Sequence, residues 1–193
     1  MSWDGVLDWT TSNQSSRVPG TGTRNTPKDM ATSTQVDRTV EERVGSLLSE
    51  ECLTLAVAES CTGGLIGHRI TCVSGSSGYF AGGVIAYSNE VKVRELDVDQ
   101  GILASEGAVS EPVARQMAEG VRKRFATDAG VGITGIMGPG GDTPGKPVGL
   151  VFVAVSTAKD CVVRRFCNSG DREELKWQSS QCALNLLLDV VRH

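Results

Sequence analysis

The chain has 193 residues, of which 39% are hydrophobic, and a formal net charge of -4, which suits a single domain that folds without disulfides or a structural metal. Lysine and arginine are scattered along an acidic chain, which excludes the basic face that binders of duplex nucleic acid usually show, so no direct nucleic-acid partner is expected. The six cysteines and two histidines form no short-spaced ligand cluster, and no apolar run reaches the roughly 18 residues of a membrane span, so we expect no metal site, no membrane partner and a reducing, cytoplasmic location.

The first 36 residues differ from the rest of the chain. They are rich in Ser, Thr, Asn and Gly and show neither a helical nor a strand period, so residues 1–36 are predicted to be a disordered N-terminal extension. A regular pattern begins near residue 40, and the folded domain is expected over 37–193. Its first elements are a helix over 40–50, a buried strand over 53–58 and a helix over 62–71.

Strands and helices continue to alternate after residue 80. In chain order, the pattern predicts a strand over 82–87, a helix over 89–96, a helix that starts at Glu111 with Ser110 as its N-cap, strands over 129–134, 148–157 and 161–167, and a helix over 171–190. The stretch over 148–157 is almost wholly apolar, which is typical of a central strand buried on both faces. This order predicts an α/β fold, namely a three-layer α/β/α domain with a largely parallel, mixed sheet.

Three unusual stretches each follow a predicted strand. They are ESCTGG at 59–64, YSNEVK at 87–92 and TGIMGPGGDTPGKP at 134–147. In open α/β sheets, ligands bind outside the carboxyl ends of the strands. If these three strands are parallel, the three stretches meet on one rim of the sheet and form a binding site there.

The first stretch connects a strand to a helix through Ser-Cys-Thr-Gly-Gly. Such a connection leaves several amide N–H groups unpaired at the helix start, which suits them to a phosphate or an oxyanion, and Gly63 and Gly64 let a ligand approach the backbone closely. The same pattern also fits a plain turn in which Ser60 or Thr62 caps the helix.

Ser60 and Cys61 are adjacent candidate nucleophiles. Either would need a base, and His68 lies about two helical turns away while His193 is the last residue. A Ser-Lys pair is the remaining arrangement, with Lys92 as the base. If Asn89 caps its helix, Lys92 is the third helical residue, where the helix dipole and burial in a cleft both favour a neutral amine.

Tyr87 ends the preceding strand and could relay a proton between Lys92 and Ser60. Each of the two residues also has an ordinary structural interpretation, since Lys92 could be a solvated surface lysine and Tyr87 a half-buried strand aromatic. The third stretch is stiffened by its prolines and opened by its glycines, so its backbone can press against a planar or phosphorylated ligand. It could equally be a connection without function.

Six motifs together indicate a family. They are AESCTGG, GSSGYFAGGVIAYSNEVK, GAVSEPVARQMAEG, GITGIMGPGG, KPVGLVFVAV and GDRE, and they follow one another over about 150 residues. In these motifs and their order, the chain from about Val40 to its C-terminus resembles the CinA C-terminal domain, the nicotinamide-nucleotide amidase family.

The resemblance implies a hydrolase that converts nicotinamide mononucleotide to nicotinic acid mononucleotide and ammonia, without a metal or another cofactor, in pyridine-nucleotide salvage. It implies that Ser60 is the nucleophile and that Tyr87 and Lys92 complete the catalytic trio. It also implies a homo-oligomer and, because many relatives carry a further N-terminal domain for which this chain has no room, the stand-alone form. The expected substrate-binding residues are Cys61, Thr62, Gly63, Gly64, Thr134, Gly135, Gly138, Gly140, Gly141 and Arg172.

Three positions depart from the family pattern, and each bears on phosphate binding. Met137 stands where a small residue is usual, Asp142 where Gly or Ser is frequent, and Lys176 near where many members have arginine. Three alternatives stay open beside the amidase hypothesis: a catalytically silent nucleotide sensor linked to competence or DNA damage, a factor that acts on DNA, and a hydrolase that uses Cys61.

Overall fold

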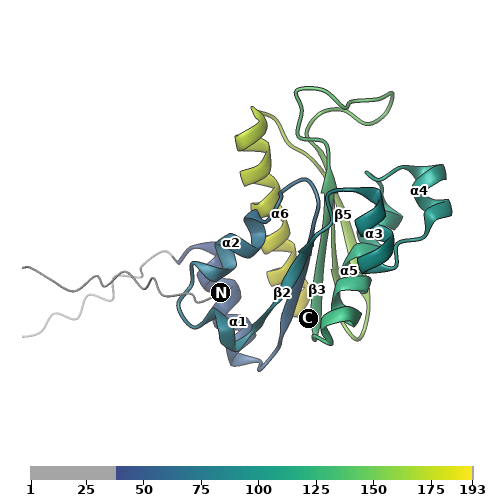
Figure 1. Cartoon of the computed structure of the whole chain (residues 1–193). Helices are drawn as coiled ribbons and strands as arrows, with labels where there is room; N and C mark the ends of the chain where they lie inside the picture. Colours follow the sequence, from purple (N-terminus) through teal and green to yellow (C-terminus); the bar gives the residue numbers. More distant parts are fainter. Residues whose placement is uncertain (1–37, 193) are drawn as a thin grey trace, which may run out of the picture. The chain divides into compact units, whose positions relative to one another are not determined.

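A five-stranded mixed sheet forms the centre of the structure, a computed structural model that describes residues 38–192 (Figure 1). The predicted extension over 1–36 lies outside the described residues. The strands are β1 Leu55–Glu59, β2 Phe80–Ile85, β3 Ala129–Gly135, β4 Leu150–Ser156 and β5 Cys161–Cys167. The helices are α1 Val40–Glu50, α2 Leu65–Thr71, α3 Asn89–Leu96, α4 Gln100–Glu106, α5 Glu111–Phe125 and α6 Arg172–Val191, with a short 3-10 helix at Ser76–Gly78.

The strand order is β2-β1-β3-β4-β5. β1 pairs in parallel with both β2 and β3, whereas β4 is antiparallel to β3 and to β5. Four of the five strands therefore run in the same direction, as the predicted largely parallel, mixed sheet requires. The carboxyl ends of β1, β2 and β3 lie at one edge, and each is followed by one of the three sequence motifs.

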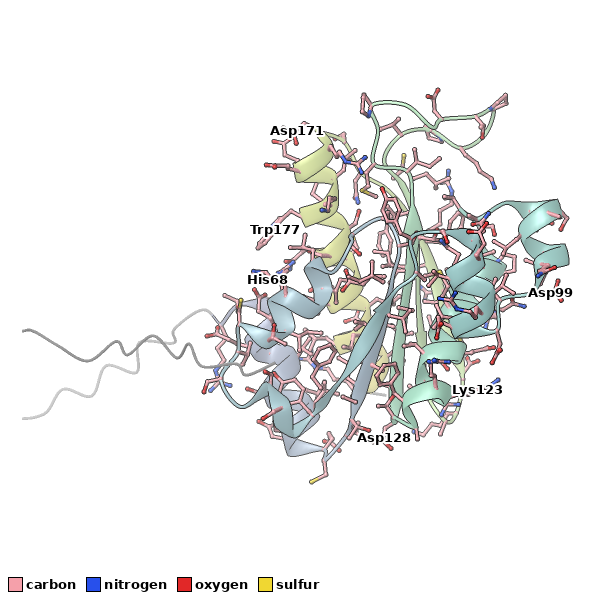
Figure 2. The ribbon with its side chains drawn as sticks, in the orientation of Figure 1. His68, Asp99, Lys123, Asp128, Asp171 and Trp177 are labelled. Carbon is pink, nitrogen blue, oxygen red and sulfur yellow. The ribbon has the colours of Figure 1, made fainter. Side chains whose placement is uncertain are left out.

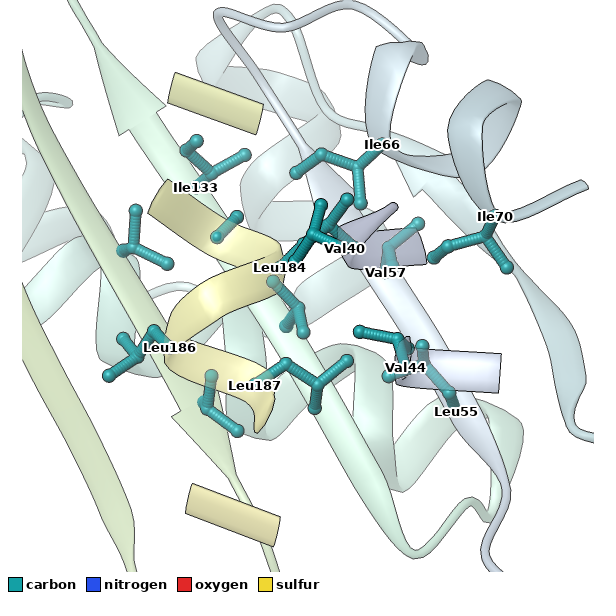
Figure 3. Close-up of a cluster of buried hydrophobic side chains, with 14 of the residues drawn as sticks. Val40, Val44, Leu55, Val57, Ile66, Ile70, Ile133, Leu184, Leu186 and Leu187 are labelled. Atoms are coloured by element: carbon teal, nitrogen blue, oxygen red, sulfur yellow. The ribbon is translucent and has the colours of Figure 1, made fainter. Parts of the chain in front are cut away.

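Helices cover both faces of the sheet and confirm the three-layer prediction. On one face, α1, α2 and α6 pack against the sheet in the larger core cluster, where Leu55, Val57 and Ile133 meet side chains such as Val44 and Leu184 (Figure 3). On the other face, α3 and α5 pack against small side chains of β1, including Ala56 and Ala58. The alternation of large and small residues along β1 assigns each to its face because successive strand side chains point to opposite sides.

Close contact between β3 and α5 depends on two glycines of β3. A Cβ added at Gly130 would collide with the Ala118 carbonyl oxygen, and one added at Gly132 would lie 2.6 Å from the Ala114 carbonyl oxygen. Any side chain at these two positions would push the helix away from the sheet. The spacing of Gly130 and Gly132 by two residues puts both on the α5 face of the strand.

Several predicted boundaries match the structure and others do not. The helices over 40–50 and 89–96 and the strand over 161–167 are confirmed to the residue. The helix expected over 62–71 begins only at Leu65, and α4 was not predicted. Ser110 occupies the N-cap position of α5, but its hydroxyl donates to the Gly107 carbonyl instead of capping the helix. Within residues 38–192, no helix is long and apolar enough to cross a membrane.

Candidate functional site

A cavity of about 220 Å³ lies beyond the carboxyl ends of β1 and β3, where the three motifs meet. It is lined by Ser60, Cys61, Tyr87, Asn89, Lys92, Ala108, Val109, Thr134, Gly135, Met137 and Arg172. A larger cavity of about 440 Å³ lies beside α1, but no residue of the three motifs lines it. Its wall contains serines but no lysine or histidine that could act as their base. The cavity of about 220 Å³ is the candidate active site because the three motifs line it.

Ser60 and Lys92 face one another in this cavity. Lys92 Nζ donates to Ser60 Oγ at 3.1 Å and to the Ala86 carbonyl oxygen at 2.7 Å. The lysine side chain is fully buried, with 1% of its surface exposed, whereas Ser60 is 9% exposed at the cavity wall. The alternative of a solvated surface lysine is therefore wrong. A serine hydroxyl in contact with a buried amine is the arrangement that a Ser-Lys pair needs.

Burial lowers the pKa of Lys92 below its ordinary value, an effect that the Cys61 and Glu90 side chains partly oppose. The helix start contributes to this setting in a different way from the one expected. Ser88, not Asn89, caps α3 and accepts from the Val91 amide, so Lys92 is the fourth helical residue. The amine still lies near the positive end of the helix dipole, which also disfavours its charged form.

Cys61 lies beside the pair but is poorly suited to attack. Its side chain is 7% exposed, and burial raises the pKa of its thiol to about 12. A Cβ added at Gly135 would come within 3.2 Å of the Cys61 sulfur, so the thiol packs against the β3 backbone. Because the thiolate is the reactive form of cysteine, this environment argues against the Cys61 alternative.

The turn after β1 differs from the predicted anion site. Gly63 and Gly64 have φ of 63° and 102°, and Gly64 is the N-cap of α2, so neither Ser60 nor Thr62 caps the helix. The amides of Gly64, Ile66 and Gly67 donate to the carboxylate of Glu59, at distances of 2.8 to 3.1 Å. The donors expected to hold an anion at the helix start are therefore already occupied by a side chain.

Thr62, Gly63 and Gly64 do not line the cavity, contrary to the expected binding set. Thr62 is fully buried, and its hydroxyl oxygen has no hydrogen-bond partner within residues 38–192. Sequence reasoning also missed Glu59. The available signal was a lone carboxylate at the end of an otherwise apolar strand, directly before a turn that leads into a helix.

Tyr87 and Arg172 form the exposed rim of the cavity. Tyr87 is 62% exposed, and its hydroxyl accepts from Arg172 Nη2 at 3.2 Å. Arg172 Nη1 also donates to the Gly138 carbonyl oxygen at 2.7 Å. Lys92 contacts the backbone carbonyl of Tyr87, at 3.4 Å, and not its phenol, so the expected proton relay is not formed in this structure. Nor is Tyr87 a half-buried strand aromatic.

The β3–β4 loop contributes less to the cavity than expected. Thr134 is 1% exposed and donates its hydroxyl to the Ala108 carbonyl oxygen at 2.8 Å, which fixes the adjoining segment at the cavity wall. Gly135 lines the cavity, Gly138 is joined to it through Arg172, and Gly140 and Gly141 are exposed outside it. The loop extends beyond the sheet on the same side as Asp171, the N-cap of α6 (Figures 1 and 2).

Sequence reasoning missed three wall residues, namely Asn89, Ala108 and Val109, and named Met137 only as a departure from the family pattern. Asn89 belongs to the YSNEVK motif, where it was expected to cap the helix and not to line the cavity. Ala108 and Val109 follow α4, an element without a strong periodic signal. Their place at the cavity depends on how the α4–α5 connection folds back over β3.

Three comparisons with known proteins agree. The family model described as the CinA C-terminal domain matches residues 37–191. A "CinA-like protein" from Gemmatimonas aurantiaca is 54% identical over 151 residues, which cover 76% of this chain and 35% of that protein. A "CinA-like protein" from Chlorobaculum tepidum is 53% identical over 155 residues, covering 78% and 37%. The chain thus spans little more than a third of these curated relatives.

Solved structures show the same architecture. The competence/damage inducible protein CihA from Agrobacterium tumefaciens superposes with a TM-score of 0.77 at 33% identity, over 80% of this chain and 94% of that one. A competence-damaged protein (CinA) superfamily member from Escherichia coli gives a TM-score of 0.75 at 31% identity, over 79% and 90%. At this similarity the likeness extends over nearly the whole described part of the chain.

Proposed function

The chain belongs to the CinA C-terminal domain family, and on that premise we propose that it is an amidohydrolase that converts nicotinamide mononucleotide to nicotinic acid mononucleotide and ammonia. The observation that carries the proposal is the contact between the hydroxyl of Ser60 and the buried amine of Lys92. A nucleophile paired with a base of lowered pKa is what amide hydrolysis without a metal requires.

The reaction begins with proton transfer. Neutral Lys92 takes the proton of Ser60 as the serine oxygen bonds to the carboxamide carbon and the carbonyl electrons move to oxygen. When the tetrahedral intermediate collapses, the C–N bond breaks and the protonated lysine gives its proton to the amide nitrogen, which leaves as ammonia. Water then attacks the acyl-enzyme with Lys92 again as the base, which releases the carboxylate and restores Ser60.

The developing oxyanion needs donors other than the amides of α2, because Glu59 occupies those. The N–H group of Cys61 comes directly after the nucleophile and belongs to a residue that lines the cavity, so we assign it this task. The residue after a nucleophilic serine supplies such a donor in other hydrolases. Removal of one donor of this kind typically costs about 2.7–4 kcal/mol of barrier.

The size of the cavity determines how the substrate lies. Small-molecule pockets usually measure about 300–1,000 Å³, so a cavity of about 220 Å³ suits the nicotinamide ring and leaves the ribose phosphate at the rim. The exposed Tyr87 ring can lie against the pyridinium cation there. Arg172 at the rim provides a cation for the phosphate.

Lys176 provides a second cation for the phosphate. It lies one turn after Arg172 on α6, and its amine is 4.0 Å from the position that a Cβ of Gly63 would occupy. A lysine offers a point charge in place of the planar fork of an arginine, so it holds a phosphate with less directional precision. Arg172 thus lines the cavity itself, and the Lys176 amine lies beside the turn that follows Ser60.

The test is ammonia release from nicotinamide mononucleotide by the wild type and by Ser60→Ala and Lys92→Ala. The wild type should release ammonia, and each variant should lose this activity. Activity in both variants would exclude the mechanism. A wild type that binds the nucleotide without releasing ammonia would instead support the silent sensor.

A further inference from the structure

Glu59 is a buried carboxylate that the proposed chemistry does not use. It is the last residue of β1, directly before Ser60, and 1% of its surface is exposed. Its Oε2 accepts from the amides of Gly64 at 3.0 Å and Ile66 at 3.1 Å, and its Oε1 accepts from the amide of Gly67 at 2.8 Å. A buried charge is tolerated only when it is well hydrogen-bonded, and these three donors meet that need.

The Ser60–Gly64 turn is held at its start as well as at its end. The Ser60 amide donates to the Ile133 carbonyl of β3, and the Ala86 amide donates to the Glu59 carbonyl. The Glu59 carboxylate then reaches forward over the turn and binds the first amides of α2. The Glu59 side chain therefore links the strand before Ser60 to the helix after it, so both ends of the turn are attached.

The turn has little stiffness of its own. Gly63 and Gly64 both have positive φ, and glycine is the residue that adopts such conformations most readily and also leaves them most readily. One backbone bond crosses the turn, from the Gly63 amide to the Ser60 carbonyl oxygen at 3.2 Å. The carboxylate of Glu59 thus provides the firmest attachment between the end of the turn and β1.

We infer that Glu59 is a positioning residue, whose carboxylate fixes the Ser60–Gly64 turn so that Ser60 Oγ stays within reach of Lys92 Nζ. The inference deepens the proposed function and rests on it, since the reaction gives Ser60 its task. A purely structural role, the capping of α2, would make a different prediction. Loss of a cap lowers the stability of the protein without changing the reactivity of a folded molecule.

The experiment compares the full-length wild type with Glu59→Gln and with Val44→Ala as a matched control. The glutamine would keep the side-chain size but turn an N–H₂ group toward backbone N–H donors. Val44 is buried in α1, outside the cavity, so its truncation lowers stability without touching the turn. The reactivity of Ser60 is read with a fluorophosphonate probe, in which a bond from Ser60 Oγ to phosphorus forms and fluoride leaves, by intact mass over a range of pH.

We expect Glu59→Gln to react about 100-fold more slowly than the wild type, the cost typical of misplacing a reacting group by about 1 Å. The pH midpoint of labelling should stay where Lys92 sets it, because the base itself is unchanged. Val44→Ala should react at the wild-type rate even though its Tm falls. Equal labelling rates of Glu59→Gln and the wild type would overturn the inference.

A second measurement does not depend on reactivity. The ¹³Cε resonance of Lys92 in ¹³C-lysine-labelled protein should move in Glu59→Gln and stay in place in Val44→Ala, because only the first variant displaces Ser60 Oγ from the amine. If the wild type neither reacts with the probe nor releases ammonia, the proposed amidase function fails. The resonance then decides the positioning role alone, and an unmoved Lys92 signal in Glu59→Gln would contradict it.

Discussion

Three neutral oxygens surround the Lys92 amine, namely Ser60 Oγ and the carbonyl oxygens of Ala86 and Tyr87. None of the ion pairs within residues 38–192 includes Lys92. Burial without a paired carboxylate lowers the pKa of the amine, and the same burial raises the pKa of the neighbouring Cys61 thiol. Burial thus favours the neutral forms of the Lys92 amine and the Cys61 thiol. The site therefore offers a basic amine next to the Ser60 hydroxyl and disfavours a Cys61 thiolate.

At this scale, we predict opposite outcomes for the two neighbouring nucleophile candidates. Ser60→Ala should lower the rate of ammonia release by about 10⁴-fold, the scale seen when one member of a nucleophile–base unit is lost. Cys61→Ser should keep most of the activity, because the buried thiol packs against the β3 backbone and its raised pKa keeps it from acting as a nucleophile. Circular dichroism of both variants provides the folding control. If Cys61→Ser releases no ammonia while Ser60→Ala stays active, the nucleophile is Cys61 and not Ser60.

The rate should also depend on pH through Lys92. The pKa of this amine is lowered from its ordinary value of 10.5, so its basic form becomes available at a lower pH than in an exposed lysine. Turnover under saturating substrate should rise with pH and level off below 10.5. Lys92→Arg should be inactive at every pH, since arginine stays protonated. A rate that is flat across the range, or an active arginine variant, would remove Lys92 from the base role.

At the scale of elements, the start of α6 carries charges of both signs, with Asp171, Glu173 and Glu174 in its cap and first turn. Arg172 is its first residue and Lys176 follows one turn later, while Asp171 accepts from the amides of Glu173 and Glu174 in a capping box. These three acidic residues suit the helix dipole, and the Arg172 guanidinium donates to the Gly138 carbonyl oxygen and the Tyr87 hydroxyl at the cavity rim. We propose that Arg172, which lines the cavity, and Lys176, one turn later on the same helix, bind the substrate phosphate.

Truncation of Lys176 should therefore act on binding and not on chemistry. Lys176→Ala should raise the KM for nicotinamide mononucleotide about 10-fold, as expected for a lost charge-assisted hydrogen bond, and leave kcat unchanged. Lys123→Ala removes the same charge from α5, well away from Asp171 and the start of α6, and should change neither constant (Figure 2). Nicotinamide riboside, which lacks the phosphate, should be turned over equally by all three proteins. A raised KM for the riboside would contradict phosphate binding.

The contact between α5 and β3 predicts a stability effect that the sequence of either element would not show. In Gly132→Ala, the new methyl would lie 2.6 Å from the Ala114 carbonyl oxygen and the Ala118 amide. The helix must then shift, and the free energy of unfolding should fall by about 1–3 kcal/mol, as for other overpacked sites. The matched control is Gly78→Ala, where a Cβ meets nothing within 4 Å. Equal denaturation midpoints for the two variants would show that α5 can move away at little cost.

At the scale of the whole molecule, the sequence predicted the parts that depend on periodicity and missed those that depend on tertiary contact. Apolar spacing located α1 and α3, and the long apolar run located β4 as an interior strand. The Ser60–Lys92 pair followed from excluding histidine, and the structure brings the two together. The link between Tyr87 and Arg172 joins residues 85 positions apart, which no local pattern reveals, whereas the lone acid before the turn was an available signal for Glu59. The expected homo-oligomer stays a prediction.

The free energy of unfolding of the whole molecule should depend on pH because the Lys92 amine is buried. The folded pKa of Lys92 lies below the unfolded value of 10.5, so between these two values the unfolded chain binds more protons and stability rises with pH. Lys92→Met removes the cost of burying a charge, so it should be more stable than the wild type by about 1.4 kcal/mol per unit of pKa lowering. This advantage should be constant below the folded pKa and should shrink from there up to 10.5. Urea denaturation across the pH range measures it, and a gap that does not shrink with pH would mean that Lys92 titrates as an ordinary lysine.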